Sequence, residues 1–108
     1  MKGYLLIYNT GDRKDITKIN HELFGRIIIV PQKSKKARYY YPGSFENTGH
    51  FKLANGCYFV KVKGSDCNGL VKYIDVDIDV PESVLITARE KRLEYAISNG
   101  FEVKHLTD

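Results

Sequence analysis

The residues with the clearest potential for chemistry lie between Lys33 and Gly43, where four cations accompany three consecutive tyrosines. Cations attract phosphate over a distance, and tyrosine rings offer flat surfaces on which bases stack. We therefore predict a nucleic-acid-binding site made of Lys33, Lys35, Lys36, Arg38, Tyr39 and Tyr41. In a strand, Tyr39 and Tyr41 share one face and Tyr40 points to the other. In the alternative, the tyrosines pack into the core beside a solvated, lysine-rich turn, because tyrosine favours strands in any case.

A second candidate lies in the segment Gly49-His50-Phe51-Lys52. A metal-independent ribonuclease needs a base, an acid and a cation that stabilises the developing charge on phosphorus. His50, Lys52 and a tyrosine from 39–41 would supply such a set. The alternative is a loop histidine without a catalytic role.

Metal and cofactor sites are not expected. Asp75, Asp77 and Asp79 alternate along an apolar segment, so in a strand they spread over about 13 Å, too far for one ion. Cys57 and Cys67 lack the spacing of a structural zinc site, and Cys57 is expected to be a buried free thiol. The aspartates are expected to form the solvated face of a strand whose other face carries Ile74 and Val76.

The composition is that of a soluble globular domain, with 108 residues, 43% hydrophobic and 28% charged. The net charge of +4 favours acidic partners, nucleic acid first. The apolar run near the N-terminus is too short for a secretory signal, and no run approaches the ~18 apolar residues of a membrane span. We therefore expect a cytoplasmic protein without a membrane partner.

Hydrophobic periodicity predicts two helices and six strands. Gly25 is expected to end the first helix, Pro31 to end the second strand, and Thr87 with Glu90 to form a capping box that begins the second helix. That helix is expected to bury Leu93, Ala96 and Ile97. The predicted strands are 3–8, 26–30, 37–41, 57–63, 70–80 and 101–106; the helices are 16–24 and 87–99; and 43–56 is a long loop.

This order predicts one α+β domain over residues 1–108. Two βαβ units flanking extra strands favour a ferredoxin-like split βαβ sandwich, with a mostly antiparallel sheet, an extra hairpin and two helices.

The function we expect is that of a small basic nucleic-acid-binding domain without catalysis. RNA or another single strand is favoured over duplex DNA, because no helix rich in base-reading side chains is evident. Two alternatives stay open. One is a protein-interaction or dimerisation module, or a subunit of a larger complex, that uses an exposed strand edge. The other is the small metal-independent ribonuclease centred on His50.

Overall fold

The computed structural model describes residues 1–32, 35–100 and 102–105. For Gln32, Lys35, Lys36, Arg38 and residues 102–105 it describes the backbone alone. The chain is α+β, and most predicted elements are present with shifted ends. In chain order the elements are β1 (Lys2–Ile7), α1 (Arg13–Phe24), β2 (Arg26–Gln32), β3 (Lys35–Tyr41), β4 (His50–Ala54), β5 (Cys57–Val60), β6 (Lys72–Asp77), the short 3-10 helix η1 (Glu82–Val84), α2 (Ala88–Ser98) and β7 (Glu102–His105).

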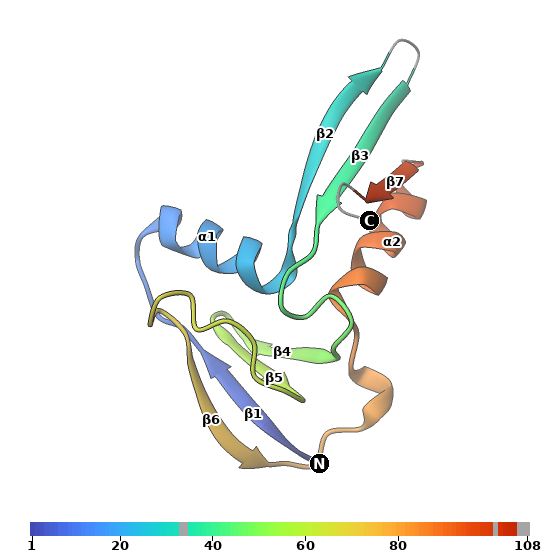
Figure 1. The fold of residues 1–108 in the computed structure, drawn as a ribbon. Helices are drawn as coiled ribbons and strands as arrows, with labels where there is room; N and C mark the ends of the chain where they lie inside the picture. The colour runs from blue at the N-terminus through green and yellow to red at the C-terminus, as the bar shows by residue number, and fades with distance from the viewer. Residues whose placement is uncertain (33–34, 101, 106–108) are drawn as a thin grey trace.

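The seven strands in the described part of the chain form two sheets (Figure 1). The four-stranded sheet has the order β4-β5-β1-β6 and is antiparallel throughout. The three-stranded sheet has the order β2-β3-β7, with β2 and β3 as an antiparallel hairpin and β7 parallel to β3. The predicted ferredoxin-like arrangement is not confirmed, because the strands divide between two sheets instead of forming one.

The main core lies between α1 and one face of the four-stranded sheet. Ile19 and Leu23 of α1 are completely buried there, against Leu6 of β1 and Val60 of β5. Phe45 and Cys67 close the core from the connecting segments. This face, which we call the inner face, therefore holds the hydrophobic contacts that fix α1 on the sheet.

The helix ends follow the local signals in the sequence. The side chain of Asp12 accepts a hydrogen bond of 2.8 Å from the Lys14 N–H and caps α1, with Asp15 in the first turn. Gly25 ends α1 at φ 80° and ψ −179°, a backbone region that is essentially restricted to glycine. The predicted capping box of Thr87 and Glu90 is present at the start of α2.

Two segment predictions were wrong. Residues 43–56 are not one loop, because they contain β4, which pairs with β5 through a hairpin that turns at Asn55 and Gly56. Pro31 does not end β2. It lies opposite Lys36 within the hairpin, on the outermost strand of its sheet, where a residue without an N–H is tolerated.

Two predicted buried faces were wrong in part. Asp75, Asp77 and Asp79 are exposed, as predicted. However, Tyr73 of β6 packs against the main core on the same side of the strand as Asp75, and Ile74 is 49% exposed on the other side. In α2, Ala96 is buried as predicted, but Leu93 and Ile97 are exposed. The buried positions of α2 are Ala88, Arg92 and Ala96, four residues apart.

Both cysteines are free; Cys67 is buried and Cys57 only half-buried. Among the described residues, no helix combines the length and the apolar character that crossing a bilayer requires.

Candidate functional site

The predicted basic–aromatic run lies on the β2–β3 hairpin, which projects from the rest of the molecule (Figure 1). Lys33 lies outside the described residues, and the side chains of Lys35, Lys36 and Arg38 are not described. Lys35 and Tyr41 begin and end β3, which places their backbones about 20 Å apart. The run therefore extends along the hairpin, with lysines toward the tip and tyrosines at the base.

The tyrosines at the hairpin base differ in exposure. Tyr40 is 1% exposed, whereas Tyr39 and Tyr41 on the opposite face are half-buried. The guanidinium of Arg26 lies 4.6 Å from the centre of the Tyr41 ring and that of Arg92 5.2 Å from the centre of the Tyr40 ring. Tyr40 is thus a core residue, and burial followed by the negative charge of Glu46 raises its pKa.

Beside the hairpin base lies a cavity of about 410 Å³, which we call the central cavity. Residues from α1, β2, β4, β5 and α2 line it. Its polar lining residues are Asn20, His50, Lys91 and Arg92, and its aromatic ones are Phe24, Tyr58 and Tyr95. The volume is within the range of small-molecule sites, and the mixture of rings with a few polar groups is typical of them.

His50 occupies the inner wall of the central cavity. Its ring is 4.9 Å from that of Phe24 and 6.1 Å from that of Tyr58, measured between centroids. The His50 side chain is almost fully buried, and its Nδ1 has no hydrogen-bond partner among the described residues. Burial and then the charge of Lys91 lower the pKa of His50 to about 4, although the Thr48 backbone acts in the opposite direction. The imidazole is therefore neutral at pH 7.

The two cations of the central cavity have different roles. Arg92 Nη1 donates a 3.2 Å hydrogen bond to Glu46 Oε2, and these side chains are only 10% and 12% exposed. A buried pair of this kind holds both charges in place, so Arg92 is committed to the structure. Lys91 is exposed and lies at the cavity wall, where its ammonium group is available to an anionic ligand.

The predicted ribonuclease requires Lys52 and a tyrosine from 39–41 beside His50. Lys52 is exposed two residues further along β4 and pairs in register with Tyr58. Tyr58 of β5, which is outside the predicted set, contacts the His50 ring. Burial and then the neighbouring Tyr8 raise the pKa of Tyr58 to about 12, so the phenol keeps its proton at neutral pH.

No family model, curated protein or solved structure matches this chain. The chemistry of the site is therefore what indicates the function.

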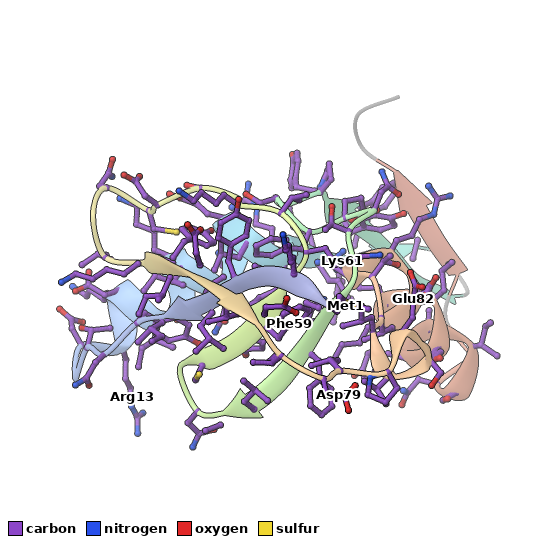
Figure 2. All side chains as sticks on the ribbon, turned by 90° about the horizontal axis from the view of Figure 1, so that it is seen from below. Met1, Arg13, Phe59, Lys61, Asp79 and Glu82 are labelled. Carbon is purple, nitrogen blue, oxygen red and sulfur yellow. The ribbon has the colours of Figure 1, made fainter. Side chains whose placement is uncertain are left out.

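A second hollow, at the far edge of the four-stranded sheet, is a weaker candidate. It has a volume of about 440 Å³ and is lined by Lys2 and Lys61 together with Asp75 and Asp77. Lys61 Nζ donates a 2.8 Å hydrogen bond to Glu82 Oε1, and the two side chains point toward one another in Figure 2. The cations there are balanced by carboxylates, so this hollow favours neither sign of ligand charge.

The described residues contain no group of three or more histidine, cysteine, aspartate or glutamate side chains placed to hold a metal ion.

Sequence reasoning missed most residues of the central cavity: Asn20, Tyr58, Lys91, Arg92 and Tyr95. The sequence did contain one signal for Arg92. It lies four residues from both Ala88 and Ala96, so these three residues share one face of the helix, and the two alanines leave room for that face to pack closely.

Proposed function

We propose that this chain is a nucleic-acid-binding domain without catalytic activity, and that its favoured ligand is RNA or another single strand. The observation that supports this most directly is the central cavity, where the rings of Phe24, Tyr58 and Tyr95 lie near the exposed cation of Lys91. Rings of this kind stack on bases, and a cation beside them attracts the phosphate of the same strand.

The position of the central cavity supports a single strand over a duplex. The cavity lies between two helices, at the base of the hairpin that carries Lys35, Lys36 and Arg38. A recessed, ring-lined site receives a base only when that base is unpaired and turned out of a stack. A single strand that follows the hairpin toward the cavity would then meet cations along the way and rings at the end.

Fluorescence anisotropy tests this function. Labelled single-stranded RNA, single-stranded DNA and duplex DNA are titrated with protein at two salt concentrations. We expect the single strands to bind more tightly than the duplex, with an affinity that falls as salt rises, because phosphate contacts release counterions. Absence of binding to all three at the lower salt would refute the proposal.

Charge-reversal variants locate the binding surface. Lys91→Glu is expected to weaken binding and to reduce the salt slope by about one for each phosphate that the lysine no longer neutralises. The same direction is expected for Lys→Glu at positions 33, 35 and 36. Lys14→Glu, at an exposed position in the first turn of α1, is the matched control and should leave the affinity nearly unchanged. Equal effects of Lys91→Glu and Lys14→Glu would indicate a diffuse electrostatic attraction instead of this site.

A different observation favours a second candidate function, the association of two copies of the chain. Phe51, Phe59, Leu5 and Ile74 lie opposite one another across all four strands of the four-stranded sheet. This row lies on the outer face, away from α1, and its end residues Phe51 and Ile74 are 36% and 49% exposed. In the view from below, this sheet lies nearest the reader (Figure 2).

The partner that this apolar row suggests is a second copy of the chain. A flat apolar face can pack on its own copy about a two-fold axis. A sedimentation coefficient that rises with protein concentration is expected, and a constant monomer value would refute this candidate.

A further inference from the structure

The interior of the central cavity is apolar and aromatic, and its buried cation, Arg92, is already paired. Phe24 stands at the centre of the ring contacts, 5.0 Å from Tyr58 and 4.9 Å from His50. The guanidinium of Arg92 is held by Glu46. A phosphate placed in this interior would therefore meet little uncompensated positive charge, and it would lose its hydration. A flat, uncharged, heteroaromatic group suits the interior better.

The polar groups of the interior are suited to the edge of such a group. Asn20 has a side-chain amide that offers both a donor and an acceptor. His50 is neutral at pH 7, so one ring nitrogen is a donor and the other an acceptor, and its Nδ1 has no partner among the described residues. Buried polar atoms without partners are rare and call for an explanation, and a ligand that completes the hydrogen bonding is one.

We infer that the central cavity receives one unpaired base of a bound strand, with Asn20 and His50 pairing with the polar edge of the base and Lys91 holding a neighbouring phosphate. This inference depends on the proposed nucleic-acid-binding function and adds to it the part of the ligand that is recognised. The hairpin then contributes phosphate contacts that do not depend on sequence, whereas the cavity binds a nucleotide only if it carries a base.

The test compares two single-stranded RNA oligonucleotides of equal length and phosphate number. One carries all its bases, and in the other the bases are replaced by stable abasic sites. Anisotropy is measured at two salt concentrations with the full-length protein. The intact strand is expected to bind at least tenfold more tightly, with the same salt slope for both strands, because stacking and base pairing to the protein do not release counterions.

Three variants connect the difference between the strands to the cavity. His50→Phe keeps the ring packing and removes the nitrogens, and Asn20→Ala removes the amide. Both are expected to bring the affinities of the two strands closer together while leaving the salt slope unchanged. His21→Phe, at an exposed position of α1, is the matched control and should preserve the wild-type difference. Circular dichroism of each variant establishes that it is folded.

The outcomes separate this inference from the function on which it depends. Equal, salt-dependent binding of both strands would leave nucleic-acid binding intact and overturn base insertion. A preference for the intact strand that both His50→Phe and Asn20→Ala retain would place base recognition elsewhere and also overturn it. No binding of either strand would overturn both proposals. Cleavage of the intact RNA that His50→Phe abolishes would replace the binding function with the ribonuclease alternative.

Discussion

At the scale of single residues, His50 is the side chain whose surroundings most change its chemistry. A histidine in water is partly charged near neutral pH, but this one is buried among rings and lies near Lys91. Both effects disfavour the imidazolium ion. The groups around it include Lys91 and Arg92 of α2 and the protonated phenol of Tyr58. Since none of these supplies a negative charge, the site keeps the imidazole neutral over the physiological range.

The lowered pKa of His50 predicts how the stability of the protein depends on pH. The pKa of His50 is about 4 in the folded protein and close to 6.5 in the unfolded chain. Between these values the unfolded state binds the extra proton, so the free energy of unfolding falls as pH falls from about 6.5 toward 4. We expect His50 to account for a loss of about 1 kcal/mol between pH 7 and pH 5.5.

Urea unfolding at the two pH values measures this effect. The His50→Phe variant should lose the His50 contribution to the pH dependence, and the exposed control His21→Phe should retain it. Identical pH dependence of His50→Phe and the wild type would contradict the assigned pKa.

At the scale of elements, the junction between α1 and β2 has the most demanding backbone. Gly25 adopts φ 80°, and a Cβ atom there would collide with the carbonyl oxygen of Tyr41 and the guanidinium of Arg92. Gly43 is equally enclosed by the backbone of Leu23. These close approaches bring the end of α1 against the base of the hairpin. They thereby form the part of the central cavity that adjoins the three-stranded sheet.

Gly25→Ala is therefore expected to destabilise the protein more than a glycine replacement that carries conformational strain alone. The combination of a glycine-only backbone region and two collisions should cost about 3 kcal/mol or more. Gly69→Ala is the matched control, because Gly69 has φ 86° but open space around it, and its cost should be about 1 kcal/mol. Chemical unfolding of both variants makes the comparison. Equal costs would show that the junction adapts without strain.

At the scale of the whole molecule, the fold leaves two sheets with different surroundings. The radius of gyration is 15.0 Å, compared with about 13 Å for a compact chain of this length, in keeping with the projecting hairpin (Figure 1). The four-stranded sheet is covered by α1 on its inner face, and apolar side chains remain exposed on its outer face. The row is exposed at its ends, Phe51 and Ile74, whereas Phe59 in its middle is completely buried. Exposed apolar residues on a sheet face are typical of an interface.

If two copies associate through the outer face, a charge placed there should separate them. Ile74→Lys puts an ammonium group at the end of the apolar row and is expected to raise the dimer dissociation constant at least tenfold. Ile97→Lys is the matched control, since Ile97 is 78% exposed on α2, away from this sheet. Sedimentation velocity of both variants across a range of concentrations measures the dimer dissociation constant of each. An unchanged dimer in Ile74→Lys would exclude the outer face as the interface.

Local signals predicted the elements well wherever one residue type dictates the backbone. Gly25 ends α1 because few other residues adopt its conformation, and Thr87 with Glu90 begins α2 because their side chains satisfy free N–H groups. β4 was missed because the glycine and asparagine residues around it resemble a loop, although the pair Asn55 and Gly56 marks a hairpin. The sequence did not predict which face of α2 is buried, because Arg92 on that face is buried through its pairing with Glu46, a residue 46 positions away.

The sequence alone determined that the chain is a basic α+β domain with two helices and several strands, because periodicity, caps and charge are local properties. It also determined which tyrosines of the run share a face, since alternation is a property of any strand. Only the tertiary structure decided how the strands divide between sheets and that His50, Asn20 and Lys91 line one cavity. These residues come from three elements that are distant in the chain. Their meeting depends on which hydrophobic faces pack together, and that is a property of the whole molecule.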